Sequence, residues 1–193
     1  VFGTNDQPVV NNVEVSQPEA LNGSNTISGI LSVTDDDVSD KHTFYAVEDN
    51  VGKTLYSINS PALVSVNSII VDTDGSYTVT GDFNALAVGE SAIVTFQYYA
   101  VDSSSAQTNG ESNTSELKTI TITITGTNDV PVITNTSTEL FGTVIEAGNN
   151  DDGSIIQGKA TVTGQLSATD VDHGATQTWS VQGTPSTTYG NIT

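Results

Sequence analysis

A seven-residue motif occurs twice in this chain, and its spacing constrains the fold more than any other feature. Gly3-Thr4-Asn5-Asp6-Gln7-Pro8-Val9 recurs as Gly126-Thr127-Asn128-Asp129-Val130-Pro131-Val132, a shift of 126 minus 3, or 123 residues. That shift is the length of one ordinary domain. The second copy follows residues 119–125, in which Thr and Ile alternate as in a strand. The motif therefore predicts a tandem array, with Asn-Asp before Pro lying between the last strand of one module and the next module.

A second repeated segment shows where the two copies differ in length. Residues 163–172 repeat residues 28–37 with a shift of 164 minus 29, or 135, which implies an insertion of 135 minus 123, or 12 residues. The insertion is expected within 141–158. The alignment continues to Trp179, the counterpart of Phe44, and no counterpart of the later strands follows.

The two shifts define four predicted segments. A half sandwich would leave an apolar face and open strand edges. We therefore expect the incomplete repeat to be disordered, to pair with another chain, or to have lost residues that followed it. The segments are a linker from a preceding module (1–8), a β-sandwich repeat (9–126), a junction linker (127–131) and the N-terminal part of a second, truncated repeat (132–193).

Alternation with a period of two dominates the chain, whereas helical periodicity is scarce. The fold class is predicted to be all-β, with about seven strands in the first module, as in an immunoglobulin-like sandwich. Asp74-Gly75 between two alternating runs indicates a tight hairpin that needs a positive φ. The predicted strands are 9–15, 27–33, 43–47, 68–71, 77–80, 93–101 and 117–125.

The charge is strongly one-sided, because 23 Asp and Glu oppose 4 Lys and Arg, for a net charge of −19. This charge argues against nucleic acid and anionic membranes as partners and favours a cation. The chain has no Cys, hence no disulfide, thiolate metal site or thiol nucleophile. It also has no apolar run of the roughly 20 residues that membrane insertion needs. Its Thr, Ser, Asn, Asp and Gly enrichment is typical of a secreted domain.

Enzymatic motifs are scarce. No Gly-x-Ser-x-Gly elbow occurs, and only two His are available as general bases. A pair of carboxylates could in principle hydrolyse glycosides. Acidic pairs that recur at module boundaries are better explained by linkage than by catalysis, so we predict that the chain is not an enzyme.

Four segments together resemble the VCBS-type repeats, which are bacterial cadherin-like modules. They are 68–78 (SIIVDTDGSYT), 85–90 (ALAVGE), 96–102 (FQYYAVD) and 119–129, the Thr-Ile run leading into Gly-Thr-Asn-Asp. The resemblance implies an extender domain of a very large Gram-negative surface adhesin that is exported by type I secretion and has an RTX-like C-terminus. It also implies an extracellular location, neighbouring repeats as partners, and contact with a host or biofilm surface through other domains.

The order of acidic motifs also resembles cadherins, in which calcium is held between successive domains. For one junction the matching residues are Glu19 after Pro18, Glu90, Asn128-Asp129 and Asp170-x-Asp172; for the other they are Asn5-Asp6, Asp35-x-Asp37 and Asp102. Glu90 follows Gly89 where cadherins have an Asp-Arg pair. The calcium ligands implied by the resemblance are Asn5, Asp6, Glu19, Asp35, Asp37, Glu90, Asp102, Asn128, Asp129, Asp170 and Asp172.

Coordination chemistry supports calcium independently of the resemblance. Ca²⁺ takes six to eight hard oxygen ligands, which carboxylates, Asn amides and backbone carbonyls supply. His42 and His173 have no spacing typical of a transition-metal site. Asp35 to Asp37 could instead be a solvated turn, and the Asn-Asp-x-Pro linkers could be turns as well. Asp72 and Asp74 are expected in a hairpin turn, and Asp151 and Asp152 are expected to face solvent.

Several residues leave open a second function, binding of a glycan or a protein by the module itself. The Thr ladder at 119–125 could present hydroxyls to ice or sugar, although it is more simply the polar face of a half-buried strand. Trp179 and Tyr98-Tyr99 could line a carbohydrate site, although core packing explains them more simply. An accessory domain of a glycoside hydrolase is a weaker alternative.

Overall fold

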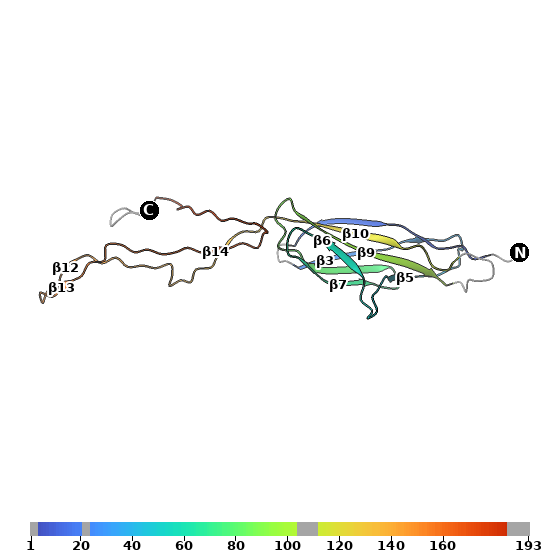
Figure 1. Cartoon of the computed structure of the whole chain (residues 1–193), viewed down its shortest axis with the longest axis horizontal. Coiled ribbons are helices and arrows are strands. Elements are labelled where there is room, and N and C mark those ends of the chain that lie inside the picture. Colours follow the sequence, from blue (N-terminus) through green and yellow to red (C-terminus); the bar gives the residue numbers. More distant parts are fainter. Residues whose placement is uncertain (1–3, 21–23, 104–111, 185–193) are drawn as a thin grey trace. The chain divides into compact units, whose positions relative to one another are not determined.

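The computed structural model describes residues 4–20, 24–103 and 112–184, which form strands and loops without a helix (Figure 1). The all-β prediction is therefore confirmed, and no candidate for a membrane-crossing helix occurs within these ranges. Gly3 of the repeated motif and residues 185–193 of the predicted second repeat lie outside the described ranges. The chain divides into a first unit, Val1–Asp129 with Asp172–Gly174, and a second unit, Val130–Val171 with Ala175–Thr193.

The first unit contains two main sheets. One has the order β2-β10-β9-β5, with β6 also paired to β9, and the other has the order β3-β8-β7. The short strands β1 and β4 pair separately. The strands are β1 (Val9–Val10), β2 (Val13–Pro18), β3 (Ser24–Ile30), β4 (Val33–Thr34), β5 (His42–Ala46), β6 (Tyr56–Asn59), β7 (Ser65–Val71), β8 (Ser76–Asp82), β9 (Ser91–Asp102) and β10 (Lys118–Thr125).

One hydrophobic core joins the two main sheets, so the first unit is a β-sandwich. Alternate residues of β9 and β10 are fully buried, which is the period-two pattern read from the sequence. Across the gap, the ring of Tyr77 on β8 meets that of Phe96 on β9 edge-on, with centroids 6.5 Å apart. The buried apolar residues are Val10, Ile27, Leu31, Phe44, Ala62, Tyr77, Val79, Phe83, Leu86, Ala92, Val94, Phe96, Tyr98, Ala100, Ile120, Ile122 and Ile124.

The predicted strand 9–15 is in fact two strands, because the chain changes partner at Asn11 and Asn12. Val9 and Val10 pair with β4, whereas β2 runs parallel to β10. Asn11 O accepts a hydrogen bond from the Tyr98 hydroxyl at 2.6 Å, and Asn12 Oδ1 accepts one from Thr119 N at 3.0 Å. These bonds hold the chain where it crosses between partners. The predicted strand 27–33 is likewise divided between β3 and β4.

Strand β6 was not predicted from the sequence. Its four residues are all exposed, so the alternation that identifies a half-buried strand is absent. It forms by pairing antiparallel with β9, from Tyr56 opposite Phe96 to Asn59 opposite Ile93. Tertiary pairing therefore decides the conformation of this segment.

The hairpin between β7 and β8 has the predicted turn. Gly75 has a φ of 89°, its N donates to Asp72 O at 2.9 Å, and Asp74 Oδ1 accepts a hydrogen bond from Ser76 N at 2.9 Å. Asp72 and Asp74 are thus turn residues, as predicted. The turn packs tightly, since a Cβ on Gly75 would lie 2.9 Å from Phe44 Cε2.

Gly75→Ala is expected to lower the free energy of unfolding of the first unit by about 2 kcal/mol or more. The left-handed conformation alone costs an L-residue roughly 1–2 kcal/mol, and the contact with Phe44 adds to it. Gly89→Ala is the matched control, because Gly89 has a φ of 87° with nothing within 4 Å of its Cβ position. Urea denaturation compares the two variants. Equal losses would show that the Phe44 contact relaxes without cost.

The second unit contains two short antiparallel pairs among its described residues. They are β11 (Val132–Ile133) with β14 (Ala168–Thr169), and β12 (Gly148–Asn149) with β13 (Ile155–Ile156). The β12–β13 hairpin lies where the 12-residue insertion is predicted. Asp151 and Asp152 are exposed in its turn, as expected, and Gly153 there has a φ of 81°. Trp179 is 48% exposed, so its predicted place in a core is wrong.

Candidate metal centre

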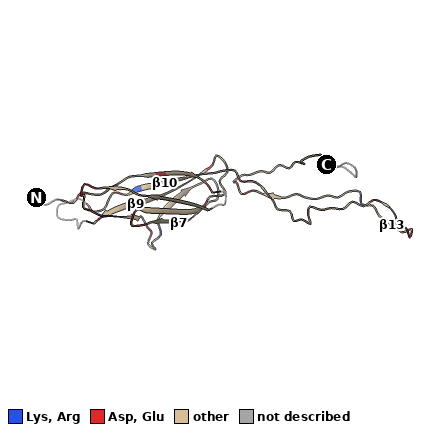
Figure 2. Cartoon of the chain, turned by 180° about the vertical axis from the view of Figure 1, so that it is seen from behind, with Lys and Arg blue, Asp and Glu red and all other residues tan. Residues whose placement is uncertain are grey.

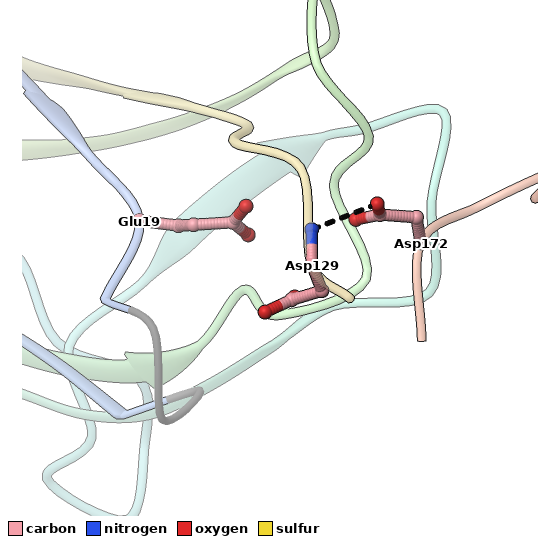
Figure 3. A group of neighbouring side chains, drawn as sticks. All are labelled: Glu19, Asp129 and Asp172. Atoms are coloured by element: carbon pink, nitrogen blue, oxygen red, sulfur yellow. Dashed lines mark hydrogen bonds between the residues drawn. The ribbon is translucent and has the colours of Figure 1, made fainter. Parts of the chain in front are cut away.

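Glu19 is a buried carboxylate immediately after β2 in the first unit (Figure 3). Its backbone N donates to Thr125 O at 2.9 Å, which continues the pairing with β10. Thr127 N and Thr127 Oγ1 donate to Glu19 Oε1 at 2.6 and 3.1 Å. The residue is 5% exposed, and its second oxygen, Oε2, is buried with no hydrogen-bond partner. An acceptor in that state costs free energy unless something binds it.

Two further carboxylates converge on Glu19. One oxygen each of Glu19, Asp129 and Asp172 lies within 4.8 Å of the others, and we call this group the Glu19 cluster. Asp129 N donates to Asp172 Oδ2 at 3.0 Å, a contact drawn in Figure 3. Burial raises the pKa of Glu19, and the negative charges of Asp129 and Asp172 raise it further, while the Thr127 hydrogen bonds oppose the shift. A bound cation would relieve both the burial and the repulsion.

Gly126 fixes the segment that carries Asp129. Its N donates to Glu90 O at 2.9 Å, and a Cβ at this position would collide with the carbonyl oxygens of Leu86 and Ala87. Only glycine fits this close approach of two backbones. The Gly of the repeated motif therefore has a packing role, which sets where the following Asn-Asp begins.

Glu90 is held beside the cluster but is not a member of it. Its Oε2 accepts a hydrogen bond from Ala87 N at 3.1 Å, and its Oε1 is 2.7 Å from His173 Nδ1. The hydrogen bond from His173 is the main reason why the pKa of Glu90 lies below its ordinary value. His173 N also donates to Ala85 O at 2.9 Å. The sequence did not predict a role for His173. This residue follows Asp172 directly, and its two hydrogen bonds connect it to both ends of the 85–90 turn.

A second acidic group lies where β9 ends. Asp35, Asp40 and Asp102 have oxygens within 4.8 Å of one another, and we call them the Asp102 cluster. Asn5 Nδ2 donates to Asp102 Oδ2 at 3.2 Å, and Asn5 Oδ1 is buried without a hydrogen-bond partner. Glu90 directly precedes the twelve-residue strand β9 and Asp102 is its last residue, so roughly 40 Å of strand separates them. In Figure 2 the strands of the first unit are mostly tan, and red marks chiefly the loops at their ends.

The two clusters differ in how their carboxylates are already engaged. Asp35 Oδ2 is 2.8 Å from His42 Nε2, and Asp35 Oδ1 accepts a hydrogen bond from Asp37 N at 2.9 Å. Burial raises the pKa of Asp35, but the His42 and Asp37 hydrogen bonds and the His42 charge outweigh it and leave the pKa lowered. Asp35 is thus stabilised as an anion without a metal, in contrast to Glu19. The Glu19 cluster is the stronger candidate for a cation.

The eleven predicted ligands divide among the Glu19 cluster, the Asp102 cluster and residues outside both. Glu19, Asp129 and Asp172 form one cluster, and Asp35 and Asp102 belong to the other. Asp40 was missed, although it continues the acidic run that begins at Asp35. The structure does not group Asp170 with the Glu19 cluster and assigns it to the second unit. Four of the remaining predicted ligands, Asn5, Asp6, Asp37 and Asn128, hydrogen-bond to cluster members or to one another. The fifth, Glu90, hydrogen-bonds to Ala87 and His173.

The same hydrogen bonds occur at both copies of the motif. Asn128 Nδ2 donates to Asp129 O at 2.6 Å, and Asn5 Nδ2 donates to Asp6 O at 3.0 Å. Asp129 N donates to Asp172 Oδ2, as Asp6 N donates to Asp37 Oδ2 at 2.7 Å. The residues correspond through the shifts of 123 and 135 found in the sequence. The hydrogen-bonding geometry of the backbone and the carboxylates therefore repeats together with the amino-acid sequence.

No protein-family model matches the chain, and no curated protein matches it significantly.

Proposed function

We propose that the chain is a structural repeat of a bacterial cell-surface adhesin, in which calcium at module junctions stiffens the array and so supports adhesion or biofilm formation. One observation carries the proposal. The Glu19 carboxylate is buried, its Oε2 lacks a hydrogen-bond partner, and it converges with two further carboxylates within 4.8 Å. Three carboxylates held this close repel one another when ionised, and a bound cation would relieve that repulsion.

The donor set fits calcium better than other metals. Every member of the Glu19 cluster offers oxygen, and the nearby His173 already contacts Glu90. Ca²⁺ accepts such oxygen ligands in flexible geometry, whereas zinc and copper sites use imidazole or thiolate. Glu19, Asp129 and Asp172 would hold the ion. They come from the first repeat, the linker and the sequence of the second repeat, so one ion would restrain all three.

The pairing of the short strands supports a tandem arrangement. In the first unit Val9 pairs with Thr34 and Val10 with Val33. In the second unit Val132 pairs with Thr169 and Ile133 with Ala168. The first residue of each pair is shifted by 123 and the second by 135, so the register repeats across the predicted insertion. This agreement supports the interpretation of the second unit as a copy of the first.

Corresponding apolar residues of the two copies differ in exposure. Four core residues of the first unit are 1–5% exposed, and their counterparts in the second unit are 46–59% exposed. In the first unit these residues belong to one core together with buried residues of β8, β9 and β10. The pairs are Val10 and Ile133, Ile27 and Val162, Leu31 and Leu166, and Phe44 and Trp179.

The remaining parts of the proposal rest on composition and on the resemblance to VCBS-type repeats. A net charge of −19 without Cys suits an extracellular protein that binds calcium and needs no disulfide. The partners would be neighbouring repeats, with attachment to a host or biofilm surface through other domains. No catalytic role is included in the proposal.

Calorimetric titration of the whole chain with CaCl₂ tests the assignment of the ligands. Asp172→Asn should lose binding at the Glu19 cluster only, and Asp37→Asn should weaken binding at the Asp102 cluster only. Glu14→Gln is the matched control, since Glu14 is an exposed carboxylate on β2, the strand that precedes Glu19. Equal stoichiometry in Asp172→Asn, Asp37→Asn and the parent would remove these assignments.

A further inference from the structure

The outward face of the five-stranded sheet carries a group of uncharged polar side chains. Thr95 and Gln97 on β9 lie opposite Thr121 and Thr119 on β10. Ser57 on β6 pairs with Thr95, and their hydroxyl oxygens are 2.6 Å apart. Hydroxyl and amide groups can donate and accept hydrogen bonds at once.

An aromatic pair adjoins these residues on the same face. Tyr45 on β5 and Tyr99 on β9 are register partners, and their rings stack with centroids 5.6 Å apart at 27°. Tyr45 is 40% exposed, so this pair does not belong to the core. Tyr99 is two residues beyond Gln97, which places the pair roughly 7 Å further along β9. We call Tyr45, Tyr99, Gln97, Thr95, Thr119 and Ser57 the tyrosine face.

A shallow groove of about 330 Å³ is lined in part by Ser57, Thr95, Gln97 and Thr119 of this face, and the two tyrosines lie outside it. Its lining residues include Leu55, Ser57, Thr95, Gln97 and Thr119, and none of its lining residues is charged. The chain has a net charge of −19, so a groove without charged residues differs from the acidic character of the chain as a whole. Its volume lies at the small end of the range for ligand sites, which is roughly 300–1,000 Å³.

From these features we propose that the tyrosine face binds a neutral glycan. A sugar ring presents an apolar C–H face that packs on an aromatic ring, and hydroxyls that both donate and accept hydrogen bonds. Tyr45 and Tyr99 supply the first kind of contact, and Gln97, Thr119 and Ser57 supply the second. An anionic glycan would meet repulsion from the acidic chain and no cation in the groove.

The proposal adds a direct contact with polysaccharide to the mechanical role. A groove this small and open gives a weak contact for one module. Repetition of the module along an array would raise the avidity by effective concentration, without any new contact. Tyr45, Gln97 and Tyr99 belong to neither acidic cluster, so the proposed binding needs no calcium.

Affinity electrophoresis of the whole chain in native gels tests the proposal. Each gel contains one soluble polysaccharide, either a neutral β-glucan, α-glucan, galactomannan or xylan, or anionic alginate, and all gels contain EDTA. At least one neutral polysaccharide should retard the chain, and alginate should not. Absence of retardation by all four neutral probes, or stronger retardation by alginate, overturns the proposal.

Variants locate the binding on the protein. Tyr45→Ala should weaken the retardation about tenfold, because the exposed ring supplies the stacking surface. Tyr45→Phe should keep it, and so should Leu63→Ala, which changes a 95% exposed residue outside the face. Circular dichroism checks that each variant is folded. Retardation of folded Tyr45→Ala equal to that of the parent overturns the assignment to this face.

Discussion

Calcium in hundredfold excess over its dissociation constant is expected to raise the thermal midpoint of the first unit by roughly 10 °C. A ligand at that excess that binds only the folded state stabilises it by about 2.7 kcal/mol. The Glu19 cluster provides the reason, since its three carboxylates converge only in the folded chain. Magnesium should give a smaller shift, because it demands near-octahedral geometry and dehydrates reluctantly. Differential scanning calorimetry in EDTA, MgCl₂ and CaCl₂ at fixed ionic strength measures the three midpoints.

Glu19→Gln separates the cluster from the general acidity of the chain. The substitution keeps the shape of the side chain and removes its charge, so the calcium-induced shift should be largely lost. Glu14→Gln removes one exposed charge and should keep the shift. An undiminished shift in Glu19→Gln would place the bound calcium elsewhere.

The pH dependence of the metal-free protein has a definite sign at Glu19. The pKa of Glu19 in the folded state is raised from its ordinary value of 4.5. Its favourable contribution to the free energy of unfolding is therefore complete below pH 4.5 and is lost as the pH rises through the folded-state pKa. Asp35 and Glu90 have lowered pKa values, so their contributions have the opposite sign. The difference between the parent and Glu19→Gln in EDTA isolates Glu19, since the other groups are common to both. As the pH rises, the free energy of unfolding of the parent should therefore fall relative to that of Glu19→Gln.

Local alternation and turn chemistry allowed much of the first unit to be predicted. The Thr-Ile run became β10 with its isoleucines buried, and Asp74-Gly75 became the predicted hairpin turn. Alternation could not show that the chain changes partner at Asn11 and Asn12, because both neighbouring runs look like strand. It could not identify β6 either, since no residue of that strand is buried.

The candidate site could be predicted only in part, because sequence patterns do not show which residues the fold brings together. Repetition identified Asp129 and Asp172, but it could not show that Thr127 fixes one oxygen of Glu19 and leaves the other without a partner. Asp40 joins Asp35 and Asp102 because a loop brings it there, and neither repeat shift marks that position. Tyr99 was predicted together with Tyr98 as core, yet successive residues of a strand face opposite sides. Tyr98 is buried, and Tyr99 stacks on Tyr45 instead.

Corresponding aromatic residues in the two units should differ sharply in their contribution to stability. Phe44→Ala is expected to lower the free energy of unfolding by about 3–5 kcal/mol, the range for a buried aromatic truncated in a core. Trp179→Ala, 135 positions later, should change it by no more than about 0.5 kcal/mol, as for an exposed residue. Phe44 is 5% exposed and Trp179 is 48% exposed. Urea denaturation followed by far-ultraviolet circular dichroism measures both variants without relying on tryptophan fluorescence.

The comparison distinguishes a second unit in which Trp179 stays exposed from one in which pairing with another chain buries it. If two chains paired through their second units, Trp179 would become buried and its truncation would cost more than about 1 kcal/mol. The loss would then depend on protein concentration, since a folded dimer is stabilised by mass action. A large loss that does not vary with concentration would mean that the second unit completes a core from its own residues. A small loss is the expected result, because the side chain of Trp179 is largely exposed in the second unit whereas that of Phe44 is buried in the core of the first.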